Sequence, residues 1–158
     1  MAEKKSGISY EQIIKDLKAR KFAPVYVLMG DESFYIDKIC DFISENVLKP
    51  EEQDFNQTVV FGADVNAMQV VDMCKGYPMM AEYRVVVVKE AQNLRNLEPL
   101  EKYLLNPVKT TILVLCHKNG SIDRRKKFIP QAEKVGVVFE SKKLYDRQLP
   151  GFIETYLK

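Results

Sequence analysis

The sequence predicts a three-layer α/β/α domain built on a five-stranded parallel sheet. Two observations support this fold class. First, apolar runs of strand length recur, and the clearest, residues 85–88, is a run of valines without polar alternation, as in a strand buried on both faces. Second, segments with helical apolar spacing separate these runs, a pattern typical of right-handed crossovers within one parallel sheet. With 158 residues, the chain suits a single domain with a substantial core.

Composition excludes several classes of function. The formal charge of +2 argues against a protein that binds nucleic acid through its overall charge. No apolar run approaches the roughly 20 residues of a membrane helix, and residues 1–7 lack the apolar segment of a signal peptide. The three cysteines, Cys40, Cys74 and Cys116, are odd in number and widely spaced. This pattern favours a reducing cytoplasm and thiols used as small apolar side chains.

The first half of the chain predicts two helices and two strands. Ser9 begins a capping-box pattern at the start of the first helix. The second helix begins at the acidic and hydroxyl residues 31–33 and stops before Pro50. Strands are expected over residues 25–29 and over the more polar residues 55–61, which should lie near an edge of the sheet.

The second half of the chain alternates in the same way. Asn66 caps a helix that should turn Met68, Val71 and Cys74 inward. Further strands are expected over residues 85–88, 110–116 and 135–140. Further helices are expected over residues 97–105, from Ser121 through the basic run 124–127, and over residues 149–157.

The loop after the first strand is the first place to look for a ligand, because parallel sheets bind ligands at the carboxyl ends of their strands. A phosphate-binding loop needs several glycines followed by Lys and Ser or Thr. Residues 30–35 contain one glycine, Gly30, and no lysine. Asp31 and Glu32 place negative charge where phosphate would bind. Nucleotide hydrolysis is therefore not expected.

Other catalytic or metal-binding arrangements find little support. Glu90, after the valine run, would be either a metal ligand or a solvated carboxylate, and we favour the second interpretation. Cys116 and His117 are adjacent on a strand and should point to opposite faces, so they would not easily bind one zinc ion. No second histidine and no G-x-S-x-G motif is present. We therefore predict no catalytic residue, no metal site and no cofactor.

A basic run, Arg124, Arg125, Lys126 and Lys127, offers a possible contact with nucleic-acid phosphates. Four consecutive cations spread around the axis of a helix, however, and such a run is more often a solvated face. No aromatic residues accompany it that would stack on bases. We favour the solvated face and keep phosphate contact as the alternative.

Met79 and Met80 lie between a predicted helix and the valine strand. Two adjacent methionines there would either fill the core or form an adaptable contact surface. Tyr77 and Pro78 precede them, and neighbouring residues on a helical turn cannot both point inward. We therefore expect at least one methionine to be partly exposed. An exposed methionine beside a tyrosine suits insertion into an apolar groove of a partner.

Three segments of the chain together resemble the delta subunit of bacterial DNA polymerase III, a clamp-loader protein of the AAA+ fold. They are residues 24–37, 77–91 and 119–128, in the order and spacing of that family. The first is similar to the family's first strand and degenerate phosphate loop. In the second, the family has a leucine, a phenylalanine, a small residue and an acid that lead into the third strand. The last is similar to the region after the fourth strand.

The resemblance implies a subunit that binds and opens the sliding clamp, the beta subunit, for loading on primed DNA, without hydrolysing ATP itself. The family's hydrophobic pair falls on Met79 and Met80, with Tyr77, Pro78 and Tyr83 at the rim of the contact. Both members are methionine here, whereas the family usually has an aromatic residue in second place.

The resemblance also implies a cytoplasmic location, no membrane partner and no catalytic activity of this domain, although the holoenzyme is a nucleotidyltransferase, a DNA-directed DNA polymerase. The partners would be the clamp, the gamma/tau and delta prime subunits, and DNA through the assembled complex. Residues 1–144 would form the AAA+-like domain, and residues 145–158 the start of the linker and first helix of a lid. Two alternatives stay open: a nucleotide-binding domain of the P-loop type, and a DNA-binding module that uses residues 124–127.

Overall fold

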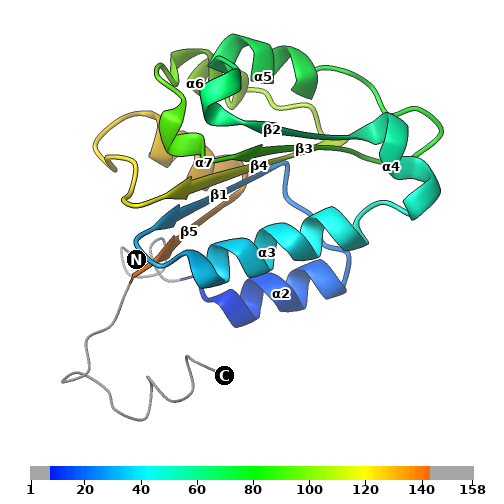
Figure 1. The fold of residues 1–158 in the computed structure, drawn as a ribbon, viewed down its shortest axis with the longest axis horizontal. Helices are drawn as coiled ribbons and strands as arrows, with labels where there is room; N and C mark the ends of the chain where they lie inside the picture. The colour runs from blue at the N-terminus through cyan, green and yellow to red at the C-terminus, as the bar shows by residue number, and fades with distance from the viewer. Residues whose placement is uncertain (1–7, 143–158) are drawn as a thin grey trace.

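The computed structural model describes residues 8–142, in which a five-stranded parallel sheet lies between two layers of helices (Figure 1). The strands are β1 (Val25–Gly30), β2 (Gln57–Phe61), β3 (Arg84–Lys89), β4 (Thr111–Lys118) and β5 (Val137–Ser141). Their order across the sheet is β2-β3-β4-β1-β5, and each neighbouring pair is parallel. The predicted fold class is confirmed.

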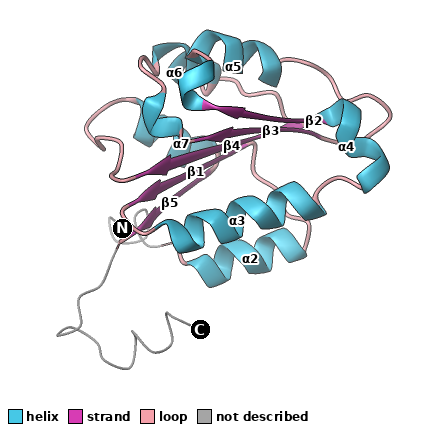
Figure 2. Cartoon of the chain, viewed as in Figure 1, coloured by secondary structure: helices cyan, strands magenta, loops and turns pink. Residues whose placement is uncertain are grey.

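Helices cover both faces of the sheet (Figure 2). One face carries α2 (Tyr10–Lys18) and α3 (Ser33–Asn46), and the other carries α5 (Ala67–Cys74), α6 (Glu98–Tyr103) and α7 (Phe128–Val135). Short 3-10 helices, η1 (Gly62–Asp64) and η2 (Ala91–Asn93), follow β2 and β3. A further helix, α4 (Pro50–Asn56), lies at the end of the sheet where β2 begins.

Alternate side chains of the central strands enter two separate apolar layers. In β3, Val86 and Val88 pack with α5, α6 and α7, whereas Val85 and Val87 pack with α2 and α3. The valine run is thus buried on both faces, as predicted. The more polar β2 lies at an edge of the sheet, which is also confirmed.

The structure corrects the predicted strand over residues 55–61. The strand begins only at Gln57, because Phe55 and Asn56 form the last turn of α4. Pro50 occupies the first turn of α4 together with two glutamates, and both features stabilise a helix start. The prediction took Pro50 only as the end of the preceding helix.

Met68 is also placed differently from the prediction. Its side chain is 53% exposed, because the inward face of α5 consists of Ala67, Val70, Val71 and Cys74. These residues are spaced at helical intervals of three and four, and Met68 lies off that stripe. The predicted burial of Val71 and Cys74 is confirmed.

The basic run does not lie in a helix capped by Ser121, as predicted. Residues 124–127 precede α7, which begins at the buried Phe128. Asp123 closes a turn instead: its carboxylate accepts the backbone N–H of Arg125, and its carbonyl oxygen accepts that of Lys126. Asp is favoured in such turns because its side chain competes with helical hydrogen bonding.

The cysteines Cys40, Cys74 and Cys116 are free and buried, in agreement with their predicted packing role. Burial raises the pKa of Cys74 to about 12, so this thiol stays protonated. Among residues 8–142, no helix has the length and apolar character needed to cross a membrane. The predicted helix over residues 149–157 and the predicted boundary after residue 144 lie outside the described residues.

Gly30 and Gly120 allow a matched test of packing at the end of β1. Their φ angles are similar, 132° and 137°, but a Cβ atom at Gly30 would collide with the carbonyl oxygen of Ser141, whereas space is open at Gly120. We expect Gly120→Ala to lower the free energy of unfolding by about 1–3 kcal/mol through backbone strain. Gly30→Ala should cost at least about 2 kcal/mol more, because overpacking adds to the strain. Chemical denaturation measures both variants, and equal losses would contradict the close approach.

Candidate protein-binding surface

The methionine pair lies in a loop, residues 75–83, between α5 and β3. Because β3 pairs in parallel with β2, this loop and α4 lie at the same end of the sheet. Met79 is 60% exposed and Met80 is 99% exposed. The expectation of at least one exposed methionine is confirmed, although the segment is an irregular loop and not a helical turn.

The backbone of Met80 has an unusual conformation. Its φ angle is 56°, in the left-handed region. This region costs a residue with a side chain about 1–2 kcal/mol and therefore persists only where the surrounding contacts impose it. The preceding residue, Met79, is held by hydrogen bonds from α4.

The buried side chain of Asn56 holds the backbone of Met79. Its Oδ1 accepts the N–H of Met79 at 2.6 Å, and its Nδ2 donates to the carbonyl oxygen of Met79 at 2.9 Å. The same Nδ2 donates to the carbonyl oxygen of Glu52 within α4, also at 2.9 Å. Asn56 is only 1% exposed, and a buried polar group left without a partner would cost about 1–3 kcal/mol. These hydrogen bonds therefore fix the loop to α4 at one defined point.

Arg84, the first residue of β3, connects the same elements a second time. Its Nε donates to the carbonyl oxygen of Met73 at 3.0 Å, and its Nη1 donates to that of Phe55 at 3.4 Å. Both carbonyls lie in the last turn of a helix, where a cation is favoured, and that of Met73 also accepts the backbone N–H of Gly76 at 3.3 Å. Arg84 thus joins the ends of α4 and α5 to the start of β3.

A groove of about 440 Å³ lies between α4 and the methionine loop. Phe55, Met79 and Met80 line it with apolar side chains, and Lys49 and Glu51 contribute charge. Phe55 is 67% exposed. Exposed aromatic and methionine side chains gathered in one place, with charged residues beside them, are typical of protein-binding surfaces.

The other residues predicted for the rim of the contact are distributed differently. Tyr77 is strongly exposed but lines a neighbouring groove between α5 and α6, and Pro78 is half-buried. Tyr83 is half-buried and packs edge-on against Phe22, with ring centroids 5.3 Å apart, in the layer of α2 and α3. The structure therefore does not bring Tyr77 or Tyr83 into the methionine groove.

Sequence analysis missed Phe55, Asn56 and Arg84. The first two were hidden by the incorrect strand over residues 55–61. The helix-start pattern of Pro50 followed by two glutamates was the available signal, because it predicts that the next residues continue a helix. Nothing in the sequence signals the role of Arg84, which depends on carbonyl groups distant along the chain.

The loop after β1 lies at the opposite, carboxyl end of the sheet. The N–H of Gly30 donates to Gly120 at 2.9 Å, and the N–H of Glu32 donates to Ser141 at 3.3 Å, both to carbonyl oxygens. The Glu32 carboxylate caps α3 by accepting the N–H of Phe34 at 3.0 Å. In a phosphate loop such N–H groups point at the phosphate. Here they bind protein atoms, and Glu32 adds negative charge at the start of the helix.

The remaining candidate ligands at this end of the sheet are also engaged. Glu90 accepts a hydrogen bond from the side chain of Gln92 at 2.7 Å. His117 Nδ1 lies 3.1 Å from the carbonyl oxygen of Gly120, and burial lowers the pKa of His117. Among the residues that the structure describes, no group of three or more His, Cys, Asp or Glu could hold a metal ion.

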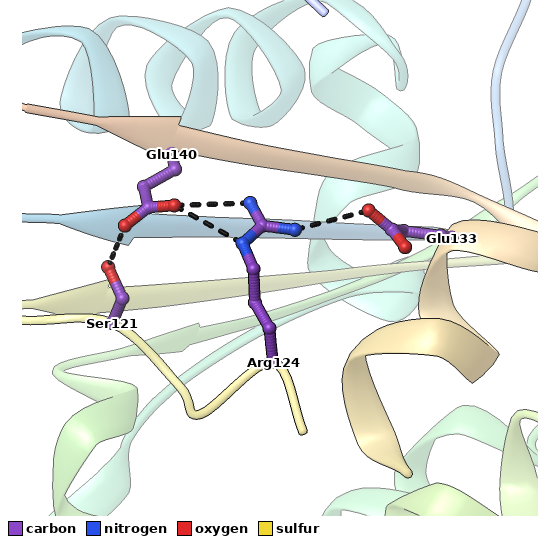
Figure 3. Close-up of polar contacts among 4 residues, drawn as sticks. All are labelled: Ser121, Arg124, Glu133 and Glu140. Atoms are coloured by element: carbon purple, nitrogen blue, oxygen red, sulfur yellow. Dashed lines mark hydrogen bonds and ion pairs between the residues drawn. The ribbon is translucent and has the colours of Figure 1, made fainter. Parts of the chain in front are cut away.

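Arg124 connects the loop after β4 to β5 and α7 (Figure 3). Its Nη2 lies 3.1 Å from Glu140 Oε1, and its Nη1 lies 3.2 Å from Glu133 Oε2. Ser121 donates its hydroxyl to Glu140 Oε2 at 2.6 Å. The guanidinium is thus shared between two half-buried carboxylates, a structural role that sequence analysis did not predict.

The rest of the basic run faces the surface. Arg125 forms an exposed ion pair with Asp123 at 3.0 Å, and Lys126 and Lys127 are exposed. An exposed ion pair of this kind contributes little to stability. Of the four residues predicted to contact phosphates, Arg124 has a structural role, and the other three are cations on the surface.

The strand order, the helices on both faces and the internally bonded loop after β1 define an AAA+-like domain with a degenerate nucleotide loop. Its fold is similar to that of the Bacillus subtilis DNA clamp loader delta protein, with a TM-score of 0.77 and 26% identity, over 91% of this chain and 45% of that one. A gamma subunit-related protein of DNA polymerase III from Thermotoga maritima shares the fold, with a TM-score of 0.51 and 13% identity, over 94% of this chain and 50% of that one.

The sequence comparison identifies the family. The model of the family described as DNA polymerase III, delta subunit, matches residues 26–142. The chain therefore belongs to the DNA polymerase III delta subunit family. It is 28% identical over 148 residues to DNA polymerase III subunit delta of Bacillus subtilis strain 168, which covers 87% of this chain and 43% of the relative. The chain thus spans less than half the length of that relative.

Ionisation of Glu140 should make the stability of the fold depend on pH. Burial, the largest influence, raises its pKa, but hydrogen bonds from Ser121 and Arg124 outweigh burial and lower the pKa below its usual 4.5. A carboxyl group whose pKa is lowered by folding stabilises the fold above its unfolded pKa, and this contribution is lost as the pH falls through the folded pKa. We expect Glu140→Gln to be less stable than wild type near neutrality and to lose less stability on acidification. Denaturation midpoints over a pH series measure this, and parallel curves would contradict it.

Proposed function

We propose that this chain is the clamp-binding part of a clamp-loader delta subunit, and that Met79 and Met80 insert into an apolar pocket of the sliding clamp. One observation carries the proposal: two large apolar side chains are exposed on a loop, and hydrogen bonds from the buried Asn56 side chain hold the backbone of that loop in place. A loop held in advance loses less conformational entropy on binding. The position of the pair in the family resemblance supports the same assignment.

In this proposal the clamp opens because the chain binds the open ring more tightly than the closed ring. Moving a ring from about 1% to about 99% open requires roughly 5.5 kcal/mol of differential binding. Full burial of two methionine side chains supplies about 3–6 kcal/mol. The pair could therefore open the clamp unaided only if nearly all of its contact were made with the open state, so further contacts are expected.

The proposal gives this chain no part in ATP hydrolysis. The engaged N–H groups of Gly30 and Glu32, and the carboxylate at the start of α3, support this part of the proposal. Several expectations stay predictions. They are binding to the gamma/tau and delta prime subunits, contact with DNA within the assembled complex, a cytoplasmic location, and a domain that ends near residue 144.

Direct contact with DNA also stays a prediction, now limited to three of the four basic residues. Arg125, Lys126 and Lys127 are exposed and would be available to phosphates, whereas Arg124 would have to leave Glu133 and Glu140. A DNA affinity that falls steeply with salt and weakens on replacing Lys126 and Lys127 would support this contact.

The first test of the proposal is the double substitution Met79→Asp and Met80→Asp. We expect it to abolish binding to the sliding clamp of the same organism in calorimetry, because two charges would enter an apolar pocket. The thermal midpoint should change little, since both side chains are exposed. A collapse of the fold would show instead that the methionines are needed for packing.

Met80→Gly separates binding from folding more finely. Glycine adopts the left-handed conformation of Met80 without strain, so the free energy of unfolding should stay within about 1 kcal/mol of wild type. Affinity for the clamp should fall tenfold or more, as for an anchor residue. Met68→Ala is the control, because Met68 is an exposed methionine, at 53%, that lies on α5 and does not line the methionine groove. Equal affinities of Met80→Gly and wild type would reject Met80 as an anchor.

A further inference from the structure

We infer that the clamp-binding surface is composite: Phe55 of α4 is a third anchor beside Met79 and Met80, and Asn56 is the positioning residue that sets their spacing. The inference rests on the proposed function, which assigns clamp binding to the methionine pair alone. It extends the surface to a second segment of the chain, more than 20 residues earlier in the sequence.

The first argument is the position of Phe55. Its ring is mostly exposed and lines the same groove as the two methionines. Among the described residues, it belongs to neither of the two apolar layers on the sheet. A single exposed apolar side chain is ordinary. Three such side chains, from two separate segments and lining one groove, form a continuous apolar surface that a partner can cover.

The second argument is the way Phe55 is held. The next residue, Asn56, binds both backbone groups of Met79, and Arg84 donates to the carbonyl oxygen of Phe55 itself. Neighbouring residues on a helix point about 100° apart. Asn56 can therefore be buried against the loop while Phe55 stays exposed in the groove. The backbones of Phe55 and Met79 are thus held relative to each other before any partner arrives.

The third argument is energetic. Binding energy usually concentrates in a few central residues, among which aromatic side chains are over-represented. Methionine is flexible and adapts to a pocket, but it orders several rotatable bonds when it binds. A phenylalanine ring has fewer bonds to order, so Phe55 would give the surface a rigid part beside two adaptable ones.

Phe55→Ala, compared with Phe61→Ala, tests the inference. Phe61 is the matched control because it is an exposed phenylalanine, at 48%, that does not line the groove. Calorimetry of the 158-residue chain with the sliding clamp of the same organism should show at least a tenfold weaker affinity for Phe55→Ala. Phe61→Ala should bind as wild type does. Both substitutions remove exposed side chains, so both variants should fold.

The outcomes separate this inference from the proposed function. If the wild-type chain does not bind the clamp, the proposed function fails and the inference fails with it. If wild type binds, the double aspartate variant does not, and Phe55→Ala binds as tightly as Phe61→Ala, then the methionine pair acts alone and the composite surface is wrong.

Asn56 is tested through its coupling to Phe55. Asn56→Ala removes the hydrogen bonds to Met79. If this variant does not fold, Asn56→Asp is used instead, because aspartate keeps the acceptor and loses the donor. We expect the altered spacing to weaken clamp binding tenfold or more, and Phe55→Ala to cost much less in this background than in wild type. A purely stabilising Asn56 would lower the thermal midpoint but leave the affinity of the folded chain and the cost of Phe55→Ala unchanged.

Discussion

The hydrogen bonds between the Asn56 side chain and the backbone of Met79 are the constraint on which the candidate surface depends. They satisfy a buried side-chain amide, and they hold the backbone of Met79 directly before Met80, whose backbone is left-handed. The exposed pair thus belongs to a loop that hydrogen bonds from a buried side chain hold to α4.

The two ends of the sheet differ in which of their groups are free to bind a partner. In open parallel sheets the carboxyl end of the strands is the usual site of ligands. Here the loop after β1 is tied to the segments after β4 and within β5 through Gly30 and Glu32, and a carboxylate caps the helix that follows. Three exposed apolar side chains, Phe55, Met79 and Met80, line one groove at the opposite, amino end, between α4 and the methionine loop. The same buried strands carry both ends of the sheet, so a loop that is bonded internally at one end leaves the other end free to present an exposed apolar groove.

Much of this arrangement could be predicted from the sequence, because it follows from local patterns. The valine run fixes a central strand, the polar β2 lies at the edge, and the single glycine of residues 30–35 rules out an ordinary phosphate loop. The expectation that at least one methionine is exposed was also correct, although it assumed a helical turn where the structure has an irregular loop. The parts that could not be predicted depend on contacts between distant segments. Asn56 and Met79 are 23 residues apart, and Arg124 reaches Glu140 over 16 residues. The shortened strand at Phe55 was predictable, but the helix-start signal of Pro50 was overlooked.

The proposed contact between the clamp and Met79 and Met80 can be observed in carbon-13 methyl spectra of the methionines, recorded with and without the clamp. Met29, buried in β1, and Met68, exposed on α5, serve as internal controls within the same sample. We expect the Met79 and Met80 methyl signals to shift or broaden on adding the clamp, while those of Met29 and Met68 stay in place. Unchanged Met79 and Met80 signals, in a sample where the clamp is bound, would contradict it.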